Sequence, residues 1–560
     1  MRSDRADLAV LAGLALAKLV FHLATSSGWG IFRDELYYLA CADRLAWGYV
    51  DHPPLSIALL AASRGLFGDS LLAVRCLAAV AGAASVFVTG LIARQLGARR
   101  GGQVLAALAT FFAPQFIAVS HFYSMNAFEV LFWSLLEWLA VLILLYDRPR
   151  LWLVFGLVAG LGLQNKLTLA VLIVGLVVGL ALTAQRRQLL SPWLWLGGAM
   201  AALILAPHLW WQAQHDWPTR EFMANAAAMK NVHMGPLEFF LAQITLAHPL
   251  AAPLWIAGLV ALFFPALLSL PPFESFPPFE RWGPGGISPT DAERRAGISS
   301  TNVDWKIPPH RPFSKGGGTA HPLRGLGIAY LVAFAIFVTQ GGKVYYLTPI
   351  YPLLYAAGAA LLDGAAVRWR WRWPVPAAAV GMLVGGLVTV PLAMPLLSVD
   401  GYLAYARVIG LAPPRMENNR AGDLPQIFAD MFGWQELADA VGRVADRLSP
   451  ADRARAVIFA GNYGEAGALE WFGPAHHLPR VISGHNNYWL WGPGDLRDDD
   501  PVIVVGGTPE RLQPLFASVE QVGVSRCTHC MPYESDLPIY LARGLREPIE
   551  QVWQKLKRFI

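Results

Sequence analysis

Runs of about 20 apolar residues recur along most of the chain, and each is long enough for a helix that crosses a lipid bilayer. They lie at 8–27, 70–93, 102–120, 127–146, 192–211, 243–268, 325–339, 349–362 and 375–397, and residues 151–184 hold two shorter runs. Hydrophobic residues make up 55% of the chain and charged residues only 15%, whereas a soluble enzyme carries roughly a quarter charged residues. We therefore expect a polytopic α-helical membrane protein with about eleven transmembrane helices.

Basic residues at alternate ends of these runs predict how the chain is oriented. Loops rich in Arg and Lys stay on the cytoplasmic side of a membrane. The loops predicted to be cytoplasmic are those that contain Arg2, Arg5, Arg94, Arg99, Arg100, Arg148, Arg150, Arg186, Arg187, Arg368, Arg370 and Arg372. Successive loops alternate between the two sides of the membrane consistently only if 151–184 forms a helical hairpin of two spans. The loops between the basic ones, and all residues after 398, then face outward.

The first outward loop, 28–69, concentrates ionisable groups directly after the first span. It contains Arg33, Asp34, Glu35, Asp43, Arg44, Asp51 and His52. Charges beside hydrocarbon are costly, and they are usually functional. The alternative is structural: Asp34 caps one helix and Asp51 caps a helix that starts at Pro53, because Asp is a favoured N-cap and Pro suits the first helical turn. Both interpretations remain open from the sequence.

Three further outward loops hold polar groups that could meet the first one. Residues 164–166 include Lys166, loop 212–242 includes Arg220, Lys230 and His233, and loop 340–348 includes Lys343 and Tyr345. Singly, each is explained equally well as part of a solvated loop with aromatic residues at the membrane interface. Their convergence on one face predicts a common site.

Composition divides the chain into a transmembrane domain, 1–398, an insertion within it, 269–323, and a soluble outward domain, 399–560. The insertion is rich in Pro, Gly and Ser without periodicity, which predicts a disordered cytoplasmic segment. In the last domain, 455–460 and 501–505 predict buried strands, and 436–448 and 509–518 predict helices, so we expect a small α/β fold.

Two short patterns in the last domain invite a functional interpretation. GNYGEAGALEWFG follows the first strand but matches neither a Walker nor a Rossmann motif, and a turn is favoured over a ligand loop. HNNYWLWGPG is an aromatic loop suited to glycan or a lipid headgroup. Cys527 and Cys530 form CTHC, for which a local disulfide is favoured over a metal site because no second ligand pair exists.

Several segments in order resemble one known family. RDELYYLACADRLAWGYVDHPPL, FGDSLLAVRCLAAV, LVAGLGLQNKLTLAVL, WWQAQHDWPTREF and GGKVYYLTPIYPLLYAAGA are similar to GT-C glycosyltransferases of the protein O-mannosyltransferase and lipid A aminoarabinose transferase type. The resemblance covers nearly all of 28–360 apart from the insertion. It implies a GT-C fold and an enzyme that takes a sugar from a polyprenyl-phosphate carrier on the non-cytoplasmic face, with no nucleotide sugar.

The resemblance also implies roles for individual residues. Asp34 and Glu35 match the acidic pair of the first loop, with Asp34 as the catalytic carboxylate. Asp51 and His52 match an acid–base–Pro-Pro motif in which the acidic position is linked to a metal and the next to lipid phosphate. His52 departs from the family's Lys, and Asn126 stands where the family often has an acidic residue.

The proposed chemistry needs cations for the leaving phosphate and a base for the acceptor hydroxyl. Lys166, Arg220, Lys230 and Lys343 are the candidate cations. One positioned carboxylate suffices for direct displacement, unlike the carboxylate pair of a retaining glycosidase. The sequence implies no definite cofactor, and a divalent metal ion held by Asp51 with His233 is an additional hypothesis.

The expected partners are a polyprenyl-phosphate sugar, membrane lipid, and a glycolipid, glycan or protein acceptor, with no nucleic acid. The expected location is a bacterial inner membrane with the active site on the periplasmic side. Two other interpretations remain: a transporter or flippase of a lipid-linked sugar, although no inverted repeat is evident, and a non-catalytic assembly protein whose outer domain binds glycan.

Overall fold

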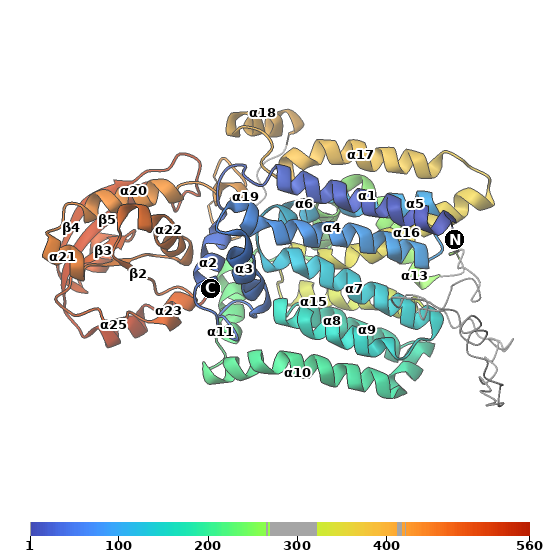
Figure 1. Ribbon diagram of the computed structural model, residues 1–560, viewed down its shortest axis with the longest axis horizontal. Helices are drawn as coiled ribbons and strands as arrows, with labels where there is room; N and C mark the ends of the chain where they lie inside the picture. Colours follow the sequence, from blue (N-terminus) through green and yellow to red (C-terminus); the bar gives the residue numbers. More distant parts are fainter. Residues whose placement is uncertain (1, 265–266, 269–321, 411–416, 421) are drawn as a thin grey trace, which may run out of the picture.

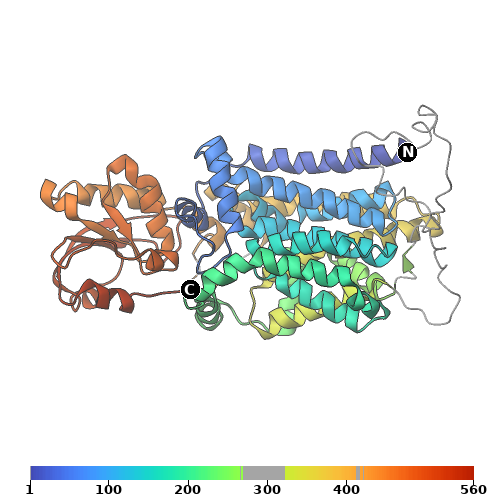
Figure 2. The same cartoon turned by 60° about the horizontal axis from the view of Figure 1, so that its bottom comes forward.

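The structure is a computed structural model that describes residues 2–264, 267–268, 322–410, 417–420 and 422–560. A bundle of helices forms one end of the elongated molecule and a small sheet domain forms the other (Figures 1 and 2). The predicted insertion, 269–323, lies outside the described residues except for its last two.

The bundle confirms the prediction of a polytopic helical membrane protein. Six single segments are long and apolar enough to cross a membrane, and three bent helix pairs raise the number to 9 in the described residues. The predicted count of about eleven is therefore not confirmed. The six segments are α1 (Arg2–Ala24), α4 (Leu71–Gln95), α7 (Met125–Tyr146), α10 (Pro192–Gln214), η6–α16 (Val344–Ile350 and Tyr351–Arg368) and α17 (Pro374–Ala393).

The lower count has a geometric cause, because several predicted spans are broken or short. The bent pairs are α5 (Arg100–Phe112) with α6 (Pro114–His121), α9 (Leu169–Ala181) with η1 (Ala184–Leu190), and α12 (Pro236–Leu246) with η3 and α13 (Pro249–Ala251 and Ala252–Phe263). The shorter apolar helices are α3 (Leu55–Phe67), α8 (Leu151–Asn165) and α15 (Arg324–Thr339). The expected hairpin over 151–184 thus becomes α8 and α9, two helices of 15 and 13 residues.

Glycines let three pairs of these helices approach closely. Gly156 of α8 faces Gly197 of α10, Gly179 of α9 faces Gly325 of α15, and Gly258 of α13 faces the backbone of α16. A Cβ atom at Gly156, Gly179, Gly197 or Gly258 would collide with the opposite backbone. Small residues serve this purpose in membranes because lipid gives apolar side chains no preference for the helix interface.

The sheet domain begins after α18 (Val399–Ile409) and has both parallel and antiparallel pairs. Its strand order is β2-β1-β3-β5-β4, in which β2, β1 and β3 run parallel and β5 and β4 pair antiparallel. The strands are β1 (Val457–Phe459), β2 (Arg480–Ile482), β3 (Val502–Val505), β4 (Phe516–Ser525) and β5 (Leu537–Leu545). The predicted strands at 455–460 and 501–505 are confirmed as β1 and β3.

Helices cover both faces of this sheet. The helices of the domain are α19 (Gln426–Ala429), α20 (Trp434–Ala445), α21 (Pro450–Arg455), α22 (Tyr463–Phe472), η7 (Gly473–His476), α23 (Asn487–Trp491), α24 (Pro509–Leu512) and α25 (Ile549–Lys555). Ile458 and Ile503 point to the face under α20 and α22, while Val457 and Val502 point to the face under α25. This alternation is the period of two expected of strands.

One predicted helix of the sheet domain is partly wrong. The stretch 509–518 is helical only in α24, because Phe516 starts strand β4 and is buried against Val457, Val502 and Trp553. Burial in the core outweighs the local preference for helix. The disulfide expected from CTHC is confirmed between Cys527 and Cys530.

Helices α2 (Arg33–Ala42), α3, α11 (Pro218–Asn225) and α19 lie between the bundle and the sheet domain (Figure 1). The N-terminus is at the opposite end of the bundle. The loops with most of the candidate residues therefore meet the sheet domain at one end of the bundle. Helix α22 packs against α2 there, and both contribute to a single apolar cluster.

Candidate functional site

Helix α2 starts at the charged part of the first loop, but neither predicted cap is present. Phe32 is the N-cap of α2, and its backbone N–H donates to the Glu35 carboxylate at 2.9 Å. Pro54 is the N-cap of α3, with no side-chain cap from Asp51. The cap interpretations of Asp34 and Asp51 are therefore wrong. Phe32 and Pro54 occupy the two N-cap positions, and Glu35, the third residue of α2, accepts a hydrogen bond from the N–H of Phe32.

Glu35 is held entirely within the protein. Its carboxylate accepts from the guanidinium of Arg75 at 2.6 and 2.8 Å and from the Tyr123 backbone N–H at 2.7 Å. Both charged side chains are buried, Glu35 at 0% and Arg75 at 1% exposure. Removing one partner of such a buried ion pair strongly destabilises a protein, because the other charge is left buried and unpaired. Glu35 thus ties the start of α2 to α4 and to the chain before α7.

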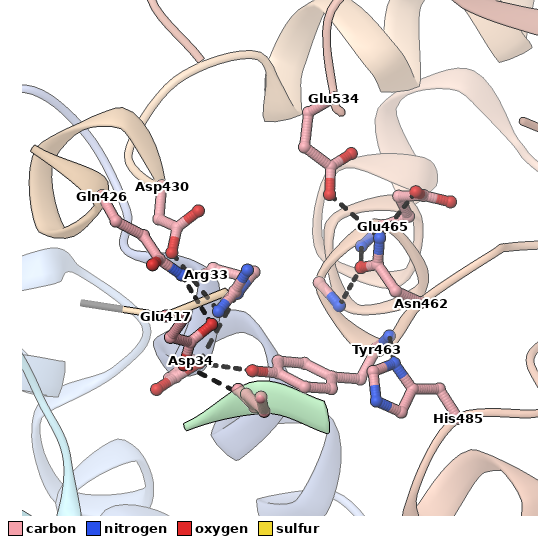
Figure 3. A network of polar contacts seen from close by, with 12 residues as sticks. Arg33, Asp34, Glu417, Gln426, Asp430, Asn462, Tyr463, Glu465, His485 and Glu534 are labelled. Atoms are coloured by element: carbon pink, nitrogen blue, oxygen red, sulfur yellow. Dashed lines mark hydrogen bonds and ion pairs between the residues drawn. The ribbon is translucent and has the colours of Figure 1, made fainter. Parts of the chain in front are cut away.

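Asp34 lies in the opposite environment, although it is the adjacent residue. Its side chain is 37% exposed, and its Oδ1 accepts from the Tyr463 hydroxyl at 2.9 Å. The Arg33 Nε lies 3.8 Å from the same oxygen. Figure 3 shows the hydrogen bond that joins the Asp34 carboxylate to the Tyr463 hydroxyl. Asp34 is therefore an accessible carboxylate with one oxygen held in place.

Arg33 joins the bundle to the sheet domain on the other side of Asp34. It donates to the Tyr533 hydroxyl at 2.6 Å, and its guanidinium lies 3.4 Å from the Asp430 carboxylate (Figure 3). Burial raises the pKa of Asp430 to about 7, although Arg33 opposes that shift. Asp430 consequently changes charge near neutral pH.

Two lysines share one carboxylate beside Asp34, and we call Lys230, Lys343 and Glu417 the lysine pair site. Lys343 Nζ lies 2.7 Å and Lys230 Nζ 3.5 Å from the same Glu417 oxygen, and the two lysine side chains keep 18% and 19% exposure. Glu417 also accepts from Gln426 at 3.1 Å. Two partly accessible cations facing one carboxylate leave a surplus positive charge.

The pKa shifts at the lysine pair site follow from this sharing. Burial alone would raise the pKa of Glu417, but Lys343 and Lys230 outweigh it and hold the pKa far below its usual value. Burial, with Lys343 adding repulsion, lowers the pKa of Lys230. For Lys343 the attraction of Glu417 exceeds the burial penalty, and the pKa is raised. Asp34 acts on both lysines in the same attractive direction.

A second group of candidates forms what we call the buried lysine site: Lys166, Glu129, Asn126 and Thr168. Lys166 Nζ lies 2.6 Å from Glu129 Oε2 and donates to Asn126 Oδ1 at 2.8 Å, and Thr168 donates to Glu129 as well. The Lys166 and Glu129 side chains are only 6% and 3% exposed. Here one cation faces one carboxylate, so the charges cancel.

Tyr345 links the two lysine sites. Its ring centroid lies 5.6 Å from Lys166 Nζ and 6.0 Å from Lys343 Nζ. A cation within about 6 Å of an aromatic face is attracted by the ring quadrupole. One continuous region therefore connects six of the predicted site residues: Asn126, Lys166, Tyr345, Lys343, Lys230 and Asp34.

Asp51 and His52 lie beside this region without joining it directly. The Tyr37 hydroxyl donates to Asp51 at 2.9 Å, and the Tyr37 ring lies 4.8 Å from the Tyr463 ring. Burial raises the pKa of Asp51, with the neighbouring His52 opposing that shift. His52 is fully buried, and its Nδ1 lies 3.1 Å from the Pro53 carbonyl, so its imidazole is not presented to a ligand.

Arg220 and His233 make no hydrogen bond or ion pair with the other candidates among the described residues, although the His233 ring lies beside Gly341 in the loop that carries Lys343. Both side chains are exposed. Among the described residues no group of three or more His, Cys, Asp and Glu is arranged to hold a metal ion. The pairing of Asp51 with His233 around a divalent ion gains no support from these positions.

Several residues of the region carry no obvious signal in the sequence. Glu417 lies between α18 and α19, Asp430 directly follows α19, and Tyr463 and Tyr533 come from the later part of the sheet domain. Only Tyr463 has a local signal, because Asn462 followed by Glu465 is typical of a helix N-terminus. Glu129 lies three residues after Asn126, one helical turn away.

Comparisons with known proteins point to the family that the sequence motifs resemble. The family described as Dolichyl-phosphate-mannose-protein mannosyltransferase matches residues 51–211. The lipid A galacturonosyltransferase RgtD of Rhizobium johnstonii is 28% identical over 262 residues, 45% of this chain and 54% of that protein. The chain thus spans about half the length of this curated relative.

Two solved structures share the fold of this chain over nearly its whole length. ArnT from Cupriavidus metallidurans bound to undecaprenyl phosphate has a TM-score of 0.51 at 15% identity, covering 95% of this chain and 97% of that one. The apo structure of the same protein gives the same TM-score and coverage at 13% identity. At such identity the likeness shows the fold. The resemblance predicted from the motifs is confirmed, and the chain has the GT-C fold of these glycosyltransferases.

Proposed function

We propose that the protein is a membrane glycosyltransferase that moves a sugar from a polyprenyl-phosphate carrier to a hydroxyl group of a glycolipid. The observation that carries the proposal is the position of Asp34, an exposed carboxylate beside two partly exposed lysines. A transferase of this kind needs a base and an anion site a short distance apart. The relationship to RgtD favours lipid A as the acceptor, and an inner membrane with a periplasmic site fits such a substrate.

In this mechanism the lysine pair binds the phosphate of the donor. Lysine ammonium groups bind phosphate through charge-assisted hydrogen bonds. Lys343 and Lys230 already converge on one anionic oxygen, that of Glu417. The donor phosphodiester carries one negative charge, as a carboxylate does, and the polyprenyl phosphate that leaves gains a second one, so it competes with Glu417 for the same two ammonium groups more strongly than the donor does.

Asp34 acts as the general base. The acceptor hydroxyl gives its proton to the Asp34 carboxylate while its oxygen forms a bond to the anomeric carbon. The bond from that carbon to the phosphate oxygen breaks, and the polyprenyl phosphate leaves with its electron pair, held by the lysines. Glu35 holds the helix turn that carries Asp34, through its bonds to Arg75 and the Tyr123 backbone.

The Asp34→Asn variant tests this proposal. Asn keeps the size and hydrogen-bonding capacity of Asp but cannot accept the proton. Transfer should fall by roughly 10²-fold or more, while binding of undecaprenyl phosphate should persist. The assay follows transfer to lipid A from undecaprenyl-phosphate donors that carry aminoarabinose, galacturonic acid or mannose.

The matched control is Asp43→Asn in the same loop. Asp43 is 60% exposed and pairs with Arg64 at 2.6 Å, away from the lysines. It should keep wild-type turnover. Wild-type transfer by Asp34→Asn, at matched expression, would remove the general base and contradict the proposed mechanism.

A further inference from the structure

The N-terminus of helix α22 in the sheet domain is unusually well fixed. The Asn462 side chain accepts from the N–H groups of Gly464 and Glu465 at 2.8 and 3.0 Å. Its amide donates to the carboxyls of Glu465 and Glu534 at 2.7 and 2.9 Å (Figure 3). Both polar groups of the Asn462 side chain are therefore in use, and the next residue, Tyr463, has a defined starting direction.

Two glycines bring this helix end directly onto α2. A Cβ at Gly464 would overlap the Arg33 side chain, and a Cβ at Gly467 would lie 2.8 Å from the Leu36 backbone carbonyl. Real Cβ contacts are not that short, so any larger residue would push the helices apart. The sequence GNYGEAGAL, which predicts a turn, therefore provides a flat helix face for contact with the membrane domain.

This contact places Tyr463 against the proposed base. Its hydroxyl donates to Asp34 Oδ1 at 2.9 Å, and no other described residue hydrogen-bonds Oδ2. The ring packs between Tyr37 and His485, each 4.8 Å away, with Arg33 over its face. Burial raises the pKa of Tyr463 well above its usual value, so the hydroxyl keeps its proton and remains a donor.

We propose that Tyr463 is a positioning residue for Asp34, so that the sheet domain completes the active site of the membrane domain. The hydrogen bond fixes the rotamer of Asp34 and leaves Oδ2 for the acceptor proton. This inference rests on the proposed role of Asp34 as the base.

The experiment compares Tyr463→Phe with Tyr488→Phe. Tyr488 lies in the same domain and donates to the Glu470 carboxylate at the same 2.9 Å, but away from Asp34. Tyr463→Phe should lower kcat by about 10-fold, the size expected for one hydrogen bond to a charged group. KM for the undecaprenyl-phosphate donor should change little, because the lysine pair is intact. Tyr488→Phe should keep the wild-type kcat.

Folding and kinetics measured on the same samples separate positioning from a structural defect. Tyr463→Phe should keep the wild-type melting temperature in detergent while kcat falls. A variant that merely unfolds in part has a lower melting temperature. A wild-type kcat in Tyr463→Phe would overturn the inference.

A second variant moves the helix without removing the hydroxyl. Gly467→Ala should lower kcat, and combined with Tyr463→Phe it should add little, because both act through the same bond. Gly473→Ala, where a Cβ meets Leu478 at an ordinary 3.4 Å, is the control. Full additivity of Gly467→Ala and Tyr463→Phe would also overturn the inference. If Asp34→Asn keeps wild-type transfer, the proposed role of Asp34 as the base fails, and this inference fails with it; if Asp34→Asn is inactive while Tyr463→Phe is normal, only this inference fails.

Discussion

The two lysine sites contain the same types of group and differ in balance. At the buried lysine site one lysine faces one glutamate, and both are nearly inaccessible. At the lysine pair site two lysines face one glutamate, and both lysines keep close to a fifth of their exposure. The buried lysine site has no net charge left for a ligand, whereas the lysine pair site has a surplus positive charge.

The comparison shows why a lysine near a membrane enzyme's active site is weak evidence of phosphate binding. A buried, matched ion pair gives little net stability over apolar packing, but it is costly to break. Lys166 satisfies that description, because Glu129 and Asn126 occupy its ammonium group. Lys343 and Lys230 are the better candidates for phosphate ligands because their carboxylate is shared.

The largest expected effect comes from breaking each site at its lysine. Lys343→Met and Lys230→Met should each weaken binding of undecaprenyl phosphate by roughly 10-fold to 100-fold, the loss of one charge-assisted hydrogen bond. Lys166→Met should instead destabilise the protein by about 3–5 kcal/mol, because it strands the Glu129 carboxylate.

Thermal unfolding in detergent and binding of undecaprenyl phosphate, measured on the same samples, check this contrast. Folded Lys166→Met protein should bind with near wild-type affinity. Loss of affinity in Lys166→Met equal to that in Lys343→Met, with an unchanged melting temperature, would show that both lysines contact the ligand.

A smaller and opposite effect is expected at the glutamates. Glu417→Gln keeps the shape of the side chain but removes the charge that competes with phosphate, so undecaprenyl phosphate should bind several-fold more tightly. Glu129→Gln leaves Lys166 buried without a counter-charge and should lower the melting temperature instead. Weaker binding by Glu417→Gln at an unchanged melting temperature would mean that Glu417 holds the lysines in position and does not compete with the ligand.

The sequence predicted the helical membrane fold, because apolar length and composition alone determine which segments can cross a bilayer. It did not predict the number of spans, since the bends at α5–α6 and α12–α13 depend on packing. In the site, Asp34 and the lysines could be named from their loops. Glu417 and Tyr463 could not, because a carboxylate in a linker and a tyrosine at a helix end acquire their roles only through contacts across hundreds of residues.

The smallest expected effect concerns Tyr345, which lies between the two lysine sites. Its ring attracts both Lys166 and Lys343, and at partly buried positions each such contact is worth about 0.5–1 kcal/mol. Tyr345→Leu should therefore weaken undecaprenyl phosphate binding about 2-fold to 5-fold, through the lost orientation of Lys343. Tyr345→Phe keeps the ring and should bind as the wild type does. In a Lys343→Met background, Tyr345→Leu should have no further effect on affinity, because the lysine that the ring orients is absent. A persistent loss there would mean that the tyrosine contacts the ligand itself, and the two sites would then form a single binding surface.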